Sequence, residues 1–373
     1  MNKLQIHENH FAQVILEQRP LIDVRAPIEF NKGSLPNSVN IPILNDEERA
    51  LVGTCYKKNG NAAAVELGHQ IVSGSNKLLK IAAWQNFIQQ YPNAIIYCFR
   101  GGMRSQITQQ WLSENNLSVP IIAGGYKKVR QFLIEYLNQA SQVLNFKNIT
   151  GPTGSGKTQL IWEVRKYVAA LDLEALARHR GSAFGGMNQA QPAQIDFENQ
   201  IAVELMKISQ NFSPSPDILI EDESRLIGRC AIPMALYNKY RQAPVIWLDE
   251  SIENRINNIF ADYITAAFLD NHKMLTEDNQ NSVQIFEKFK KSVISITRKL
   301  GHDRSKEIIN NINDSQFDFS KNRSLESNKI WIRKILEYYY DPIYLTNLNT
   351  RQPKIIYKGN FESCKLYLLT NSK

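Results

Sequence analysis

Short apolar runs alternate with helical spacing through the first third of the chain. Residues 21–24, 94–97 and 121–123 are apolar runs that end at a turn or a polar loop, which is typical of buried strands. Residues 78–90 and 126–142 have the spacing of helices. Strands that alternate with helices in this way predict an α/β fold, a parallel sheet with helices on both faces.

A second pattern of the same kind begins near Leu144. One strand leads into a glycine-rich turn, a helix is expected over residues 159–171, and strands are expected over residues 218–220 and 245–248. After about residue 250 the apolar positions recur mostly at helical spacing. This pattern predicts a second α/β domain with a helical C-terminal part.

The junction between the two patterns has no run of glycine, serine or proline. The helix expected over residues 126–142 therefore serves as a rigid connector, and we place the domains at residues 1–138 and 139–373. Short strands are expected in the tail, over residues 353–370.

Composition narrows the class of protein. The 373 residues are 43% hydrophobic and 21% charged, which excludes a largely disordered chain, and no apolar run is long enough to span a bilayer. The start of the chain lacks the long apolar segment of a secretory signal, and four cysteines without paired spacing argue against disulfides. We expect a cytoplasmic protein. The net charge of +8 favours a polyanionic partner, although it could serve solubility alone.

The first candidate site is a cysteine on a loop that follows a strand. Cys98 directly follows the apolar run that ends at Tyr97, and residues 99–105 read Phe-Arg-Gly-Gly-Met-Arg-Ser. Gly101 and Gly102 allow the loop to curl so that its amides face an anion, and Arg100 and Arg104 add positive charge. This setting favours the thiolate, so we predict that Cys98 is a nucleophile rather than a buried structural thiol.

These residues resemble the rhodanese superfamily over roughly residues 10–140. The second signature of that family is present upstream as Asp-Val-Arg at 23–25 and Glu29-Phe30, followed by residues 33–42, Gly-Ser-Leu-Pro-Asn-Ser-Val-Asn-Ile-Pro. The resemblance implies that Cys98 carries a chalcogen as a covalent adduct. Five residues separate Cys98 from Arg104, one more than in the common short loop, which indicates a larger pocket.

Other residues of this domain have less certain roles. Asp23 and Arg25 are interpreted as a structural ion pair that supports the fold, and the role of Glu29 is left open. Cys55 lies in a polar insertion and could approach Cys98 as a resolving thiol, but we favour a bystander.

The second candidate site is a phosphate loop. Residues 151–158 match G-x-x-x-x-G-K-[ST] at every position and lie between a strand and a helix, the context that the motif requires. The pattern predicts a P-loop NTPase-like domain in which the loop amides wrap a phosphate chain. The expected phosphate-binding residues are Gly151, Gly154, Gly156, Lys157 and Thr158.

Acidic residues follow the strand at 218–220. Asp222 is the best candidate for holding Mg²⁺ together with Thr158, and Glu223 lies beside it, although a run of acids could also be a solvated strand end. His179 has no partner at ligand spacing, so no metal site of histidine or cysteine is expected.

The two motif sets together resemble the bacterial tRNA 2-selenouridine synthase family. Further stretches that carry the resemblance are 53–57 (Gly-Thr-Cys-Tyr-Lys), 179–182 (His-Arg-Gly-Ser) and 221–228 (Glu-Asp-Glu-Ser-Arg-Leu-Ile-Gly). The resemblance covers nearly the whole chain. It implies a transferase that acts on the wobble 2-thiouridine of tRNA in two steps. The sulfur is first geranylated with geranyl diphosphate, and selenium from selenophosphate then replaces the S-geranyl group. The residues leave open whether the phosphate loop binds geranyl diphosphate or a nucleoside triphosphate.

A tRNA partner would need a basic surface, although a basic helix can equally be the solvated side of an amphipathic one. The candidates are Lys127, Lys128 and Arg130 on the connector, Arg178, Arg180 and Arg225 in the arginine-rich segments at 178–180 and 225–229, and Lys288, Lys290, Lys291, Arg298 and Lys299 on a later helix.

Two other classes of function stay open at this point. One is an ATP-dependent sulfurtransferase or kinase with a rhodanese sulfur carrier, which would turn over ATP without a prenyl donor. The other is an RNA-binding switch in which Cys98 senses redox state, which would leave tRNA chemically unchanged.

Overall fold

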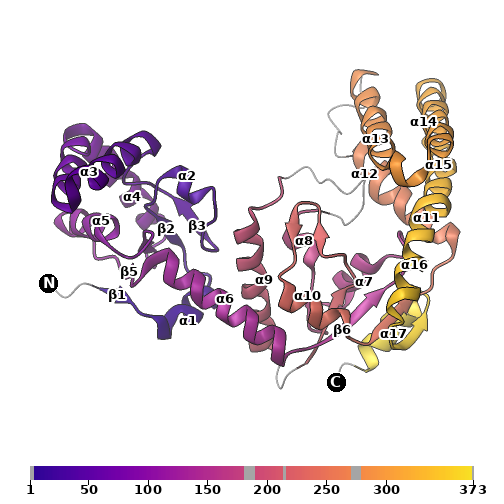
Figure 1. The fold of residues 1–373 in the computed structure, drawn as a ribbon, viewed down its shortest axis with the longest axis horizontal. Helices are drawn as coiled ribbons and strands as arrows, with labels where there is room; N and C mark the ends of the chain where they lie inside the picture. The colour runs from indigo at the N-terminus through magenta and orange to yellow at the C-terminus, as the bar shows by residue number, and fades with distance from the viewer. Residues whose placement is uncertain (1–3, 180–189, 213–215, 270–278, 372–373) are drawn as a thin grey trace. The chain divides into compact units, whose positions relative to one another are not determined.

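The computed structural model describes residues 4–179, 190–212, 216–269 and 279–371 (Figure 1). The chain forms two compact units. The first comprises Met1–Val143 with Pro192–Asn211, and the second comprises Leu144–Gln191 with Phe212–Lys373. We expected one boundary, at 138/139; residues 192–211 instead pack with the first unit.

The first unit contains a five-stranded parallel sheet, as the apolar runs predict. The strand order is β1-β5-β4-β2-β3. β4 lies between β5 and β2, pairs with both in parallel, and is fully buried. The strands are β1 (Gln5–Ile6), β2 (Leu21–Asp23), β3 (Ser38–Asn40), β4 (Ile95–Tyr97) and β5 (Ile121–Ile122).

Helices surround this sheet, and Trp84 and Trp111 lie in the core, with ring centroids 6.3 Å apart. The polar insertion around Cys55 is part of a long helix, α3, which begins in a capping box of Asn45 and Glu48 and is kinked at Gly60. The helices are η1 (Glu8–His10), α1 (Phe11–Leu16), α2 (Pro27–Phe30), α3 (Asp46–Ile71), α4 (Gly74–Gln90), α5 (Met103–Glu114), α6 (Gly125–Val143) and α9 (Gln194–Asn211).

The packing of α6 against α9 explains why residues 192–211 join the first unit. Both helices bury an apolar stripe, and α9 also contacts α1. Arg130 of α6 forms an ion pair with Glu198 and donates to Asn199 Oδ1 at 2.7 Å. Asn199 is fully buried and donates to the carbonyl oxygen of Ser34 at 2.8 Å. Arg130 therefore has a structural role within the first unit.

The second unit contains another five-stranded parallel sheet, in the order β12-β11-β6-β8-β7. The tail supplies only one of the short strands expected there, β12, and then forms a helix. The strands are β6 (Asn145–Thr150), β7 (Ala170–Leu171), β8 (Asp217–Glu221), β11 (Val245–Leu248) and β12 (Ile355–Gly359), and β9 (Leu226–Ile227) pairs with β10 (Cys230–Ala231) in a separate antiparallel ladder.

One expected helix is shorter than its sequence pattern. The helix predicted over residues 159–171 ends at Val164, and Ala170–Leu171 forms strand β7, because these residues pair in parallel with β8. The remaining helices are α7 (Lys157–Val164), α8 (Leu173–Ala177), α10 (Met234–Arg241), α11 (Ile252–Ile259), η2 (Phe260–Thr265), α12 (Ala266–Leu269), α13 (Asn279–Leu300), α14 (His302–Asn322), α15 (Asn328–Ile335), η3 (Leu336–Tyr340), α16 (Asp341–Arg351) and α17 (Phe361–Thr370).

The helical C-terminal part has its own apolar core. Phe286 and Phe289 of α13 pack with Phe319 of α14 and Trp331 of α15. This arrangement confirms the predicted class, two α/β domains of which the second has a helical extension. Within the described residues, no helix combines the length and the apolar character needed to cross a membrane.

The contacts of Arg130 generate a stability prediction. Arg130→Ala removes the ion pair with Glu198 and the hydrogen bond to the buried Asn199 Oδ1, and we expect the free energy of unfolding to fall by about 2 kcal/mol. Lys127→Ala, on the exposed side of the same helix, should change it by less than about 0.5 kcal/mol. Urea unfolding of both variants measures the difference, and equal stabilities would contradict the structural role.

Candidate functional site

Cys98 lies at the carboxyl end of β4, where open α/β sheets place their ligands. Its side chain is 3% exposed, and its Sγ atom lies 3.3 Å from the hydroxyl oxygen of Ser105. That hydroxyl also reaches the carbonyl oxygen of Gly102 at 3.1 Å. Ser105, on the first turn of α5, was not singled out from the sequence, and its hydroxyl can donate to a thiolate at Cys98.

The backbone around Cys98 is held by close contact with the start of α6. The amide of Tyr126 donates to the carbonyl oxygen of Cys98 at 2.8 Å. A Cβ atom at Gly125 would lie 2.3 Å from that same oxygen, and one at Gly101 would lie 2.7 Å from the amide nitrogen of Gly124. Both Gly101 and Gly125 have positive φ values, +64° and +59°. These glycines are therefore required for the loop geometry.

The two arginines of the loop differ in whether an acid of the protein pairs with them. Arg104 donates to both carboxylate oxygens of Glu29, at 2.5 and 3.1 Å, so its guanidinium is engaged by an acid. Burial opposes ionisation of Glu29, but the hydrogen bonds and charge of Arg104 outweigh it and lower the pKa of the carboxyl. Arg100 is exposed and its guanidinium lies 5.8 Å from the ring centroid of Phe99. Arg100 is thus better placed than Arg104 to meet an anion.

Asp23 and Arg25 form a buried ion pair, as the structural interpretation expects. The Arg25 guanidinium contacts both carboxylate oxygens of Asp23, donates to the carbonyl oxygen of Gly33 at 2.8 Å and lies 4.0 Å from the ring centroid of Tyr126. None of the four cysteines, all of which are described, forms a disulfide, and Cys55 is half-buried on α3.

The phosphate loop joins β6 to α7. Gly154 and Gly156 adopt positive φ values, +85° and +87°, which L side chains rarely adopt, and a Cβ atom at Gly151 would lie 2.6 Å from the hydroxyl oxygen of Ser155. Lys157 folds back over the loop, where its Nζ atom donates to the carbonyl oxygen of Gly151 at 2.9 Å. The motif residues thus have the conformation that a phosphate cradle needs.

Two residues outside the motif hold the phosphate loop from α11. Arg255 Nε donates to the carbonyl oxygen of Thr153 at 2.9 Å, and Asn258 Nδ2 donates to that of Gly154 at 2.9 Å. The Arg255 guanidinium also forms a bidentate pair with Asp341. No sequence motif marked these residues, because they lie about a hundred positions downstream of the loop.

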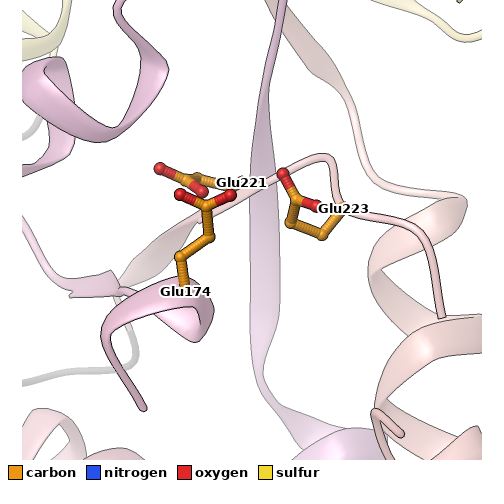
Figure 2. Close-up of side chains that lie close together, drawn as sticks. All are labelled: Glu174, Glu221 and Glu223. Atoms are coloured by element: carbon orange, nitrogen blue, oxygen red, sulfur yellow. The ribbon is translucent and has the colours of Figure 1, made fainter. Parts of the chain in front are cut away.

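Three carboxylates converge beside the phosphate loop (Figure 2). They belong to Glu174 at the start of α8 and to Glu221 and Glu223 at the end of β8, and one oxygen of each lies within 4.8 Å of the others. Thr158 Oγ1 donates to Glu174 at 3.2 Å. Glu221 is fully buried, and within the described residues neither of its carboxylate oxygens has a hydrogen-bond partner.

Burial and the neighbouring acids raise the pKa values of Glu221 and Glu223. Burial raises the pKa of Glu221 well above its usual range, with further contributions from Glu174 and Glu223. Burial and then Glu174 raise the pKa of Glu223 to about 7. A divalent cation would relieve this unfavourable charge, because hard cations take carboxylate and hydroxyl oxygens as ligands. The group of Thr158 and the three glutamates therefore fits Mg²⁺.

Asp222 occupies a different place from its neighbours. Strand β8 ends at Glu221, and the backbone turns at Asp222, where the amide of Glu223 donates to the carbonyl oxygen of Glu221 at 2.9 Å. The carboxylates of Glu221 and Glu223 lie with that of Glu174, whereas Asp222 pairs with Arg351 at 2.5 Å and accepts a short hydrogen bond from Thr150. The structure favours Glu221 over Asp222 as the partner of Glu223, and Glu174 was missed because it lies 47 positions upstream of Glu221.

The basic candidates differ in their surroundings. Lys127, Lys128, Arg178, Arg225, Lys288, Lys291, Arg298 and Lys299 are exposed. Lys128 pairs with Glu8, and the half-buried Lys290 pairs with Glu287 and donates to Asn313. Arg180 lies outside the described residues.

Comparisons with known proteins cover both units. A family model described as a rhodanese-like domain matches residues 8–131, and one described as the tRNA 2-selenouridine synthase AAA domain matches residues 144–373. The tRNA 2-selenouridine synthase of Nitrosomonas europaea is 46% identical over 382 residues, which cover 99% of each chain. Those of Bdellovibrio bacteriovorus and Shewanella frigidimarina are 42% and 40% identical, over 98% and 97% of this chain and 98% of each relative.

The carboxylate cluster predicts linked effects of pH and Mg²⁺ on stability. Because the folded-state pKa of Glu223 is raised to about 7, the stability of the ion-free protein should fall as the pH rises from about 4.5 to 7. Stabilisation by Mg²⁺ should grow over the same range, because the ion needs ionised carboxylates. Thermal melts at about pH 5 and about pH 8, with EDTA or with magnesium chloride, measure both trends.

Glu221→Gln should abolish the Mg²⁺-dependent increase in Tm without lowering the stability of the ion-free protein, since burial raises the pKa of Glu221 and glutamine has the shape of the uncharged carboxyl. Glu362→Gln, at an exposed glutamate of the same unit, is the matched control and should leave the increase intact. Equal Mg²⁺ responses in the two variants would contradict the assignment.

Proposed function

The chain belongs to the tRNA 2-selenouridine synthase family, and from that premise we propose that it converts the wobble 2-thiouridine of tRNA to 2-selenouridine through an S-geranyl intermediate. It is a transferase, with geranyl diphosphate and selenophosphate as its donors. The observation that carries the proposal is the relationship over 99% of the chain, because it spans the Cys98 loop and the phosphate loop together.

We assign geranyl diphosphate to the phosphate loop. The sulfur of 2-thiouridine attacks the first carbon of the geranyl group; the carbon–oxygen bond breaks, its electron pair leaves on pyrophosphate, and N3 of the base loses its proton. The loop amides and Lys157 would balance the charge of the leaving pyrophosphate. Mg²⁺, held by Thr158, Glu174, Glu221 and Glu223, would supply Lewis-acid stabilisation of the same charge.

We assign selenophosphate to the Cys98 loop. Selenium adds to carbon 2 of the base, the bond from carbon 2 to sulfur breaks, and geranylthiol leaves with a proton. Water then cleaves the selenium–phosphorus bond and releases phosphate. The position of Cys98 at the carboxyl end of β4, with the exposed Arg100 beside it, supports this assignment.

We assign the tRNA backbone to exposed basic residues, foremost those of α13. Lys288, Lys291 and Arg298 are exposed and share one helical face, because they are three and seven positions apart. Lys290 lies outside this group, since it is half-buried and paired with Glu287.

The assignment of the two donors predicts that the two steps can be separated by mutation. Cys98→Ser should abolish selenium incorporation and leave S-geranylation largely intact. Lys157→Ala should slow geranylation by roughly 10²–10³-fold, because the leaving pyrophosphate loses a charged donor. Selenation of tRNA that was geranylated beforehand should survive in this variant. Nucleoside mass spectrometry of reactions with purified protein measures both products.

Loss of both steps in folded Cys98→Ser protein would refute the separation of roles. Geranylation at the wild-type rate in Lys157→Ala would show that the loop binds another substrate, and ATP turnover without any prenyl donor would point to a sulfurtransferase or kinase.

The tRNA assignment predicts a change in salt dependence. Replacing Lys288, Lys291 and Arg298 by glutamine should reduce the slope of log affinity against log salt by roughly 3, because each side chain that no longer pairs with a phosphate lowers the slope by about one. The triple variant should also weaken all tRNAs alike. Lys290→Gln is the control and should leave the slope unchanged, because that lysine is paired within the protein. An unchanged slope in the triple variant would move the binding surface away from α13.

A further inference from the structure

An apolar cavity of about 680 Å³ lies between α3 and α5 in the first unit. Its walls include Ile43, Leu44, Val72, Ile107 and Trp111. It opens to solvent, because lining residues such as Tyr56 and Lys57 are exposed. The volume falls within the range of about 300–1,000 Å³ that is typical of small-molecule sites. The cavity is therefore large enough for an organic ligand, and its walls favour a hydrocarbon.

One end of the cavity adjoins the loop of Cys98. Met103 and Arg104 line the cavity. They are also the first residues of α5, directly after the loop that begins at Cys98. The next residue is Ser105, whose hydroxyl lies 3.3 Å from the Cys98 sulfur. The cavity therefore reaches the residues that directly precede Ser105, and Ser105 contacts Cys98 at the proposed selenium-transfer site.

The charged residues at this end of the cavity contact one another. Glu29 accepts two hydrogen bonds from Arg104 and lies 3.4 Å from Arg49, and all three residues line the cavity. Because Glu29 already occupies the hydrogen-bonding groups of Arg104, a diphosphate would have to compete with this carboxylate, whereas a neutral chain would not.

Helix α3 leaves space in the wall instead of filling it. Gly53 lines the cavity, and a Cβ atom built on it would meet no other atom within 4 Å. Ala64, the one buried residue of the same helix, also contributes only a methyl group. A larger apolar residue at the buried Ala64 would fill the space, and one at the exposed Gly53 would narrow its opening.

We propose that this cavity binds the ten-carbon geranyl chain of S-geranyl-2-thiouridine while selenium replaces the sulfur. The inference rests on the proposed function, in which the geranyl group is attached to the sulfur atom that leaves. The chain must then lie beside the site of displacement, and the cavity is an apolar space that adjoins the Cys98 loop. Binding the chain there orients carbon 2 of the base toward the loop and receives the leaving thiol.

The test compares the binding of two synthetic anticodon stem-loop RNAs, one with 2-thiouridine and one with S-geranyl-2-thiouridine, to the full-length protein. Wild-type protein should prefer the geranylated RNA by at least about tenfold, the factor that burial of two methylene groups already provides. Ala64→Phe, which fills the cavity, should remove this preference and leave the affinity for the thiouridine RNA unchanged. Ala62→Phe, the same change at an exposed position of α3, is the matched control and should keep the preference.

A second variant guards against misfolding of Ala64→Phe. Gly53→Leu places its side chain in open space and should also remove the preference. The inference is overturned if wild-type protein shows no preference, or if folded Ala64→Phe or Gly53→Leu retains it. Failure of the proposed function is seen separately, as failure of wild-type protein to convert the geranylated RNA to 2-selenouridine with selenophosphate.

Discussion

Parallel pairing of short buried strands is the constraint on which both candidate sites depend. In a parallel sheet every carboxyl end lies at the same edge, so the loops that follow neighbouring strands meet there. β4 places Cys98 at this edge in the first unit, and β6 and β8 place the phosphate loop and two glutamates there in the second. Glycines let backbone segments approach closely at these ends. The N-termini of the helices that follow provide backbone amides that can bind an anion. The chemistry differs between the units, but the way in which each sheet positions it is the same.

Local sequence was sufficient to predict those elements whose structure depends on one continuous segment. The strands around Cys98, the phosphate loop and the helix over residues 126–142 were predicted because each pattern is contained within about twenty residues. The failures have non-local causes. Helix α7 ends early because Ala170 and Leu171 pair with β8, and α9 packs on α6, some sixty residues away in sequence. The contacts of Glu29 with Arg104 and of Arg255 with Thr153 likewise join distant segments, which no spacing rule could reveal.

The choice between Glu221 and Asp222 shows a different limit. The run of three acids was recognised, but its functional members depend on how the backbone turns after β8 ends at Glu221. Beyond that point Asp222 meets Arg351 and Arg241, while Glu221 and Glu223 meet Glu174. Asp222 thereby forms ion pairs that stabilise the fold. Glu221 and Glu223 are buried beside another acid, which is unfavourable when they are ionised and which a bound cation would offset. The raised pKa of Glu223, about 7, reflects this unfavourable burial.

The placement of α9 has a consequence for the order of events during synthesis. The first unit needs residues 192–211 to cover α6 and α1, so it cannot be completed when residue 143 leaves the ribosome. At about 5–20 residues per second, the missing helix follows roughly 3–14 s later, after the phosphate loop has already emerged. During that interval the apolar face of α6 is uncovered, and β6, the central strand of the second sheet, lacks both of its neighbours, β8 and β11. The nascent chain therefore passes through a stage in which two exposed surfaces, the apolar face of α6 and the incomplete second sheet, are available to chaperones.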